Sequence, residues 1–243
     1  MDINLNDYVA GGYFVTKYIE SSGHGFTPSE LLPERVMSIR GCIPASFQIY
    51  WGWDTEKHKL DAMHFGITNE KFVMLSEWIN KGHYGEIEHP NVFLKAEYAL
   101  NFATEFLDLS NDFMVIGIGL HNDLVDKFRT ENYYNHDVKH GLDRLLYERL
   151  PLQLGGDILG FEVVGYNINF SCSWLCSGLE KDIHELFGIH PNQYGLIECY
   201  EDAVKVYEWI NEDKTGHSRG EPDPYYPWLI VQYPLVEGER DGN

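Results

Sequence analysis

The most informative stretch of the sequence is Phe113-Met-Val-Ile-Gly-Ile-Gly119, a short run that is almost wholly apolar. An apolar run of this kind, without alternating polar residues, is typical of a central strand that is covered on both faces. Asn122 follows, and it can cap a short helix that buries Leu124 and Phe128. The stretch therefore predicts a strand at the centre of a sheet, followed directly by a helix.

Strands and helices alternate irregularly on both sides of this run. The expected strands are rich in β-branched and aromatic residues, whereas the expected helices repeat apolar residues every three or four positions. The further strands are expected at 13–19, 47–53, 158–170 (one strand or a hairpin) and 228–233. The further helices are expected at 68–81, 91–110, 142–150, 177–188 and 200–211.

Several of these helices carry signals at their ends. Thr68 and Asn91 stand where an N-cap is expected. Ser177 and Glu180 match a capping box, in which each side chain satisfies a free backbone amide. Gly188 is expected to end that same helix.

Together these elements predict an α+β fold, a single domain over residues 1–243 with a mixed or antiparallel sheet and helices packed on it. A two-lobed chain divided near 133–141 is the alternative. Residues 237–243 are expected to form a frayed tail.

The composition excludes several classes of protein. The 243 residues include 18 basic and 38 acidic side chains, a net charge of −20, and 44% are hydrophobic. That apolar fraction is too high for a disordered chain. No run of about 18 apolar residues exists, so no membrane span is expected. A chain this negative is a poor ligand for nucleic acid or anionic lipid.

The cysteines and the N-terminal residues bear on the cellular compartment. The four cysteines are Cys42, Cys172, Cys176 and Cys199, too few for a disulfide framework. The first residues lack the basic and apolar regions of a secretory signal. We therefore expect a cytoplasmic protein with reduced thiols.

Histidines and a cysteine offer the chemistry of an enzyme. His136 and His140 have i, i+4 spacing, so on a helix both rings would face one way and could bind a metal. Cys176 lies just before an expected helix, whose dipole favours a thiolate. His24 lies in the turn-rich loop 21–29, and loops often hold sites. The alternatives are two solvated histidines, a small buried cysteine and a connecting loop, and no cofactor is expected.

Two further pairs of residues favour binding over catalysis. Arg35 and Arg40 follow that loop and could bind an anion. Trp51 and Trp53 occupy alternate positions of an expected strand, so both rings share one face and could stack on a ring or a sugar. The alternatives are a plain connecting segment and packing in the core.

Acidic residues are most concentrated in the last third of the chain. Residues 150–243 hold 16 acidic and only 5 basic side chains. Around the expected helix at 200–211 they include Glu198, Glu201, Asp202 and Glu208. Such a patch would attract a basic protein and speed the encounter, with neighbouring aromatic residues as anchors. A solubilising surface is the alternative, and mimicry of nucleic acid by carboxylates is a further one.

Three segments resemble a family of bacterial hypothetical proteins. They are Gly25-Phe-Thr-Pro-Ser-Glu-Leu31, the Ser-Trp-Leu-Cys-x-Gly-Leu-Glu stretch at 173–180, and the Pro-Asn-x-Tyr-Gly-Leu-Ile stretch at 191–197. The resemblance implies a bacterial, cytosolic source. It carries no known activity and no catalytic residue to this chain.

The sequence thus predicts a binding protein more strongly than an enzyme, because no matched acid, base and nucleophile stand out. We expect an acidic cytosolic protein-binding or inhibitor protein, such as an immunity protein that blocks a basic toxin. The alternative is a small-molecule-binding protein or an enzyme that uses Cys176, His24 or the His136 and His140 pair.

Overall fold

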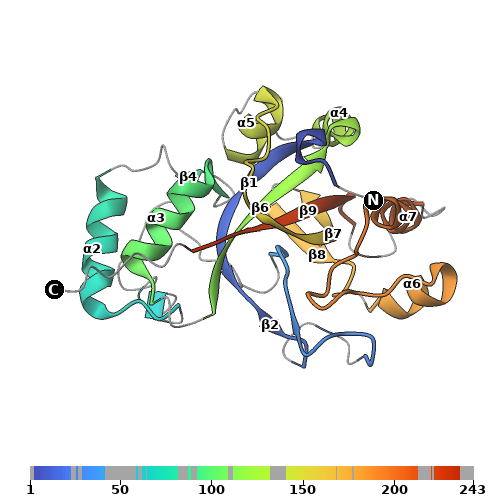
Figure 1. Ribbon diagram of the computed structural model, residues 1–243, viewed down its shortest axis with the longest axis horizontal. Coiled ribbons are helices and arrows are strands. Elements are labelled where there is room, and N and C mark those ends of the chain that lie inside the picture. The colour runs from blue at the N-terminus through green and yellow to red at the C-terminus, as the bar shows by residue number, and fades with distance from the viewer. Residues whose placement is uncertain are drawn as a thin grey trace.

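The fold combines helices with an antiparallel sheet, as the sequence predicts (Figure 1). The computed structural model describes residues 3–22, 26, 29–41, 59, 62–63, 65–81, 87–88, 92–108, 112–131, 141–167, 169–176, 178–212, 220 and 222–235. The expected strand at 47–53 and the tail at 237–243 lie outside these residues, as does nearly all of the stretch 133–141. The α+β class is confirmed.

The main sheet has seven strands in the order β4-β5-β1-β6-β9-β7-β8. Its strands are β1 (Tyr8–Lys17), β4 (Ile87–Glu88), β5 (Val92–Phe93), β6 (Phe113–His121), β7 (Asp157–Asn167), β8 (Asn169–Ser173) and β9 (Tyr225–Tyr233). All of their pairings are antiparallel. The short strands β2 (Ile19–Glu20) and β3 (Arg35–Val36) form a separate pair.

Strand β6 occupies the centre of the sheet between β1 and β9. Its residues are buried from Phe113 to Leu120, and only His121 at its end is partly exposed. Both neighbours pair with it in register over most of its length. The predicted central strand is therefore confirmed, and the absence of polar alternation in it reflects cover on both faces.

Helices cover the sheet from two sides. They are α2 (Asn69–Asn80), α3 (Ala96–Phe106), α4 (Asn122–Glu131), α5 (Gly141–Glu148), α6 (Glu180–Phe187) and α7 (Tyr200–Asn211), and a 3-10 turn, η1 (Leu5–Asp7), precedes β1. Figure 1 shows α2 and α3 on one side of the sheet and α6 and α7 on the other. None of the helices in the described part of the chain is long and apolar enough to cross a bilayer.

The helix ends show where local signals succeed. Thr68 caps α2 by accepting a hydrogen bond from the Lys71 amide, as expected. Gly188 ends α6 with a left-handed φ of 70°, also as expected. Local sequence predicts such ends well because the capping partner lies within one turn.

Two expected caps are wrong. Helix α3 begins at Ala96, whose amide donates to the Gln153 side chain at 2.6 Å, so a distant residue replaces a local cap. Helix α6 begins at Glu180 with Leu179 at the N-cap position. The Glu180 carboxyl is fully buried and accepts no hydrogen bond from the described residues, so it does not complete a capping box.

Strand β7 is completed at one edge by a loop instead of a strand. Strand β8 pairs with β7 only from Val164 onward. Beyond that point Phe161 and Ile197 exchange two backbone hydrogen bonds of 2.8 Å. Gly160, with a φ of +133°, permits this approach, because a Cβ there would lie 2.7 Å from the Ile197 carbonyl oxygen. The loop at 192–198 is therefore fixed against the sheet.

This packing predicts a large stability cost for Gly160→Ala. Its matched control is Gly155→Ala, which also has a positive φ (+92°) but has nothing within 4 Å of the added Cβ. We expect the control to cost about 1 kcal/mol from backbone strain. Gly160→Ala should cost about 1–3 kcal/mol more, because it also forces Ile197 away. Urea denaturation measures both, and equal costs would show that the loop does not depend on this contact.

Candidate functional site

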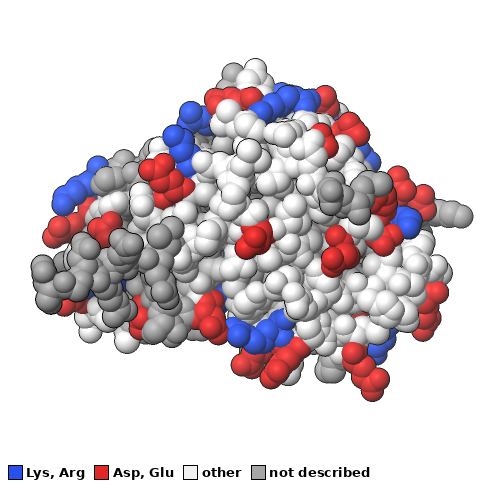
Figure 2. Space-filling view, viewed as in Figure 1, with Lys and Arg blue, Asp and Glu red and all other residues white. Residues whose placement is uncertain are grey.

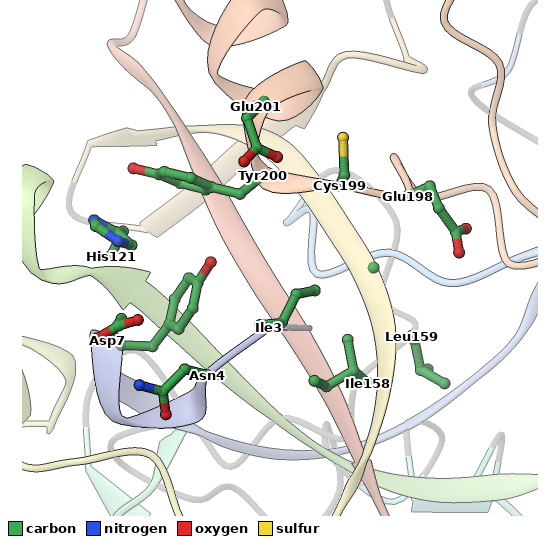
Figure 3. Close-up of a pocket in the computed structure, with 12 residues that line it drawn as sticks. Ile3, Asn4, Asp7, His121, Ile158, Leu159, Glu198, Cys199, Tyr200 and Glu201 are labelled. Atoms are coloured by element: carbon green, nitrogen blue, oxygen red, sulfur yellow. The ribbon is translucent and has the colours of Figure 1, made fainter. Parts of the chain in front are cut away.

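A cavity of about 490 Å³ opens where η1, the end of β6, the start of β7 and the start of α7 meet (Figure 3). Ile3, Ile158 and Leu159 give it an apolar side. Figure 3 shows Tyr200 and Glu201 across the cavity from Asn4 and Asp7. Its volume is in the range of small-molecule sites, which hold roughly 300–1,000 Å³.

An aromatic cluster forms another wall of the cavity. Tyr8 and His121 are cross-strand partners of β1 and β6, and their rings meet edge to face with centroids 5.3 Å apart. The Tyr200 ring stacks on His121 at 4.5 Å. The Asp123 amide donates to His121 Nδ1 at 3.3 Å. These contacts fix the three rings on the ends of regular elements, so the wall is preformed.

The charged groups of the cavity are acidic. Asp7, Glu198 and Glu201 line it, and the described lining residues include no lysine or arginine. Burial raises the pKa of Tyr200 to about 12, and carboxylates that include Glu201 add to this rise. Burial, the neighbouring Tyr200, Asp7 and Glu201 likewise raise the pKa of Tyr8. The hydroxyls therefore stay neutral, and the cavity disfavours an anion and favours a cation.

Asn192 holds the loop that carries Glu198. Its side-chain nitrogen donates to the Leu159 carbonyl oxygen at 2.8 Å and to Glu198 Oε2 at 3.2 Å. Its side-chain oxygen accepts from the amides of Tyr194 and Leu196. A single partly buried side-chain amide therefore ties the Pro-Asn-x-Tyr-Gly-Leu-Ile segment to β7 and places a carboxylate at the mouth of the cavity.

The structure places the predicted acidic residues in different surroundings. Glu198 and Glu201 both line the cavity. Asp202 instead pairs with Lys205 at 2.6 Å, and this hydrogen bond lowers the pKa of Asp202. Glu208 lies exposed further along α7 and does not line the cavity.

The two predicted arginines do not share one environment. Arg35 is exposed, pairs with Asp112 at 2.6 Å and packs its guanidinium over the Tyr18 ring. Arg40 is only 2% exposed and donates from Nη1 to Cys176 Sγ at 2.7 Å. The remaining candidates lie outside the described residues, namely His24, Trp51, Trp53, His136 and His140.

Sequence reasoning missed Asp7, Tyr8 and His121. Asp7 and Tyr8 precede the strand that was expected at 13–19, because β1 begins earlier than its β-branched residues indicate. His121 closes β6 and meets Tyr8 only through the register of two strands that are far apart in the chain. The only local signal for these residues was the possibility that the strand expected at 13–19 begins earlier, at Tyr8.

A second polar group lies beneath the segment at 37–41. Glu162 on β7 is 0% exposed. Its carboxyl accepts hydrogen bonds from the Ser38 hydroxyl and, at 2.7 Å, from the Ile39 amide. Burial raises the pKa of Glu162 to about 7, although the bonds from Ser38 and Ile39 oppose this rise. The carboxyl therefore changes its charge near neutral pH, inside the protein.

Comparison of the chain with protein-family models, curated proteins and solved structures finds no match to any of them. The resemblance of its segments to a bacterial family stays a prediction. The function must therefore be argued from the cavity and the buried polar group themselves.

Glu162 predicts a specific pH dependence of stability. Its folded pKa of about 7 exceeds the ordinary value of 4.5, so between these values the folded protein holds a proton that the unfolded chain releases. The free energy of unfolding should therefore fall by up to about 3 kcal/mol as pH rises through this window. Glu162→Gln removes that contribution.

The measurement is urea denaturation at several pH values for wild type, Glu162→Gln and Glu105→Gln. Glu105 is an exposed carboxylate on α3 and serves as the control. The free energy of unfolding of wild type, taken relative to that of Glu162→Gln, should fall as pH rises through this window, whereas Glu105→Gln should follow wild type. A constant difference would contradict the raised pKa.

Proposed function

We propose that this protein is an acidic cytosolic binding protein, an inhibitor of the immunity type, whose cavity receives a positively charged side chain of a basic partner. The observation that carries the proposal is the composition of that cavity, with three carboxylates, two tyrosine rings and one histidine, and no lysine or arginine among its described lining. A carboxylate attracts an ammonium or guanidinium group, and an aromatic ring face adds a cation–π attraction.

An arginine is the best fit among basic side chains. Its planar guanidinium can donate two parallel hydrogen bonds to a carboxylate such as Glu201 and stack on a ring such as Tyr200. Its aliphatic stem would lie against the apolar side formed by Ile3 and Ile158. Arginine is also among the residues that most often dominate the energy of protein interfaces.

The surface around the cavity supports a basic partner. Figure 2 shows carboxylates along the edge formed by α6 and α7, with few basic side chains between them. They belong to the part of the chain that holds 16 acidic and 5 basic residues from 150 to 243. Such a surface raises the association rate of a basic protein at low salt, and the cavity would supply the specific contact.

A free organic cation is the second candidate ligand. The volume of about 490 Å³ exceeds what one guanidinium needs and fits a small molecule. In that case the protein would bind an amine or guanidine metabolite without a protein partner. The two candidates differ in whether the ligand must be part of a peptide chain.

Calorimetric titration with a hexa-arginine peptide amide and with N-acetyl-arginine amide tests the proposal. We expect the peptide to bind and its affinity to fall with added salt, because exposed charges steer it. Glu198→Gln combined with Glu201→Gln should weaken peptide binding at least about tenfold, or ~1.4 kcal/mol. If the peptide and N-acetyl-arginine amide bind with equal affinity per arginine, the result would favour a free organic cation as the ligand.

The control is Glu208→Gln combined with Glu212→Gln, which removes the same charge from the last turn and the C-cap of α7, away from the cavity. This variant should lose much less affinity than the cavity variant. An equal loss in both variants would assign binding to the general surface charge and contradict the cavity. Absence of binding to either probe would contradict the whole proposal.

A further inference from the structure

A cysteine lies beside a buried arginine on a part of the molecule that does not line the cavity. Cys176 follows β8 in a turn, and its Sγ accepts a hydrogen bond of 2.7 Å from Arg40 Nη1. The Ser173 hydroxyl lies 3.6 Å from the same sulfur. Cys176 is partly exposed, so a small reagent can reach it. The site thus joins a nucleophile, a fixed cation and a hydroxyl.

Arg40 is held in place by its surroundings. It is 2% exposed, and its guanidinium carbon lies 3.7 Å from the centroid of the Phe26 ring. A guanidinium keeps its charge in proteins, and a buried charge is stabilised by a nearby anion. A thiolate at Cys176 supplies that anion. A cation that donates to a sulfur favours the thiolate, which is the reactive form of cysteine.

Glu162 belongs to the same buried group. Cys176 raises the pKa of the Glu162 carboxyl and Arg40 lowers it, after the larger effects of burial and of the bonds from Ser38 and Ile39. When the carboxyl is protonated, the thiolate still provides a negative charge beside the guanidinium. The segment that carries Ser38 and Arg40 is therefore coupled to the charge of the sulfur.

Cys199 provides a contrast within the same chain. It is also partly exposed, but burial raises the pKa of its thiol, and the carboxylates of Asp202 and Glu201 raise it further. Cys199 is therefore expected to stay protonated near neutral pH. Carboxyl groups lie near both thiols, but Cys176 also accepts a hydrogen bond from an arginine, so the two thiols should differ in reactivity.

We propose that Cys176 is a peroxide-reactive thiolate, activated by Arg40 and oxidised by hydrogen peroxide to a sulfenic acid. The sulfur attacks one peroxide oxygen, a sulfur–oxygen bond forms and the oxygen–oxygen bond breaks. The departing hydroxide takes a proton from solvent and leaves as water. The sulfur loses two electrons and the peroxide gains them, so one thiolate, one peroxide and one proton give one sulfenic acid and one water.

Arg40 and Ser173 suit this reaction by position. Both place a hydrogen-bond donor next to the sulfur, where the negative charge leaves the thiolate and develops on the peroxide oxygens. Donors that are fixed before the reaction stabilise such a developing charge without reorganisation. A buried arginine on a ring is fixed in this sense.

The primary test uses the full-length wild-type protein. Iodoacetamide labelling over a range of pH, followed by peptide mass spectrometry, gives an alkylation rate for each cysteine. We expect Cys176 to react at least about tenfold faster than Cys199 near pH 7, with a midpoint below the ~8.5 of an ordinary thiol. Equal rates, or a midpoint at or above the ordinary value, would overturn the proposal.

The oxidation step has its own readout. The protein is treated with hydrogen peroxide in the presence of dimedone, which traps sulfenic acids, and the adducts are assigned by mass spectrometry. The adduct on Cys176 should form at least about tenfold faster than that on Cys199. Fast alkylation of Cys176 without a dimedone adduct would contradict the peroxide reaction.

The role of Arg40 is tested with Arg40→Gln, Arg40→Lys and the control Arg35→Gln, which removes an arginine that pairs with Asp112. Arg40→Gln should slow both reactions of Cys176 at least about tenfold, and Arg40→Lys should retain part of the rate. Arg35→Gln should leave the rates unchanged. Circular dichroism shows whether each variant folds. If Arg40→Gln does not fold, the comparison of Cys176 with Cys199 in the wild-type protein serves as the test. An unchanged rate in folded Arg40→Gln would contradict it.

Discussion

Two polar side chains, the buried Glu162 and the partly buried Asn192, allow irregular segments to pack directly against the sheet. Buried backbone amides and carbonyls must be hydrogen-bonded, and a helix satisfies its own whereas a loop does not. Here the Glu162 carboxyl accepts a hydrogen bond from the Ile39 amide. The Asn192 side-chain oxygen accepts hydrogen bonds from the amides of Tyr194 and Leu196. A further bond joins the two segments, because the Met37 amide donates to the Tyr194 carbonyl oxygen.

The two irregular segments, residues 37–41 and 192–198, form a cover on β7 that positions both candidate sites. At one end, Asn192 and Gly160 bring the loop at 192–198 onto the strand, and Glu198 reaches the cavity. At the other end, Glu162 holds the segment from which Arg40 extends to Cys176. Glu162 and Gly160 lie two residues apart on β7, and Gly160 adjoins the register shift in its pairing with β9. One strand therefore organises an acidic cavity and a thiol.

The sequence predicts the fold better than it predicts the sites. The apolar run in β6, the Thr68 cap and the Gly188 stop are local signals, and the structure confirms each of them. Glu198 and Glu201 could be chosen from the acidic composition alone. The contact between Tyr8 and His121 depends on strand register, and no local pattern encodes it.

The bond from Arg40 to Cys176 likewise joins residues 136 positions apart in the chain. Glu162 is hidden among apolar neighbours in a strand, where a charged residue would be expected to face solvent. Its role becomes visible only when the segment at 37–41 is placed over it. Local reasoning fails at these positions because the partner of each group is tertiary, as it also was for the cap of α3.

The most direct test of this account is native-state amide hydrogen exchange of the cover on β7. The amides of Met37, Ile39 and Ile197 are each hydrogen-bonded across segments. If Glu162 and Asn192 fix the cover, these amides should exchange within about tenfold of the slowest amides of β6 and β9. Exchange as fast as that of the Leu32 amide, which donates only to nearby Ser29, would contradict the account.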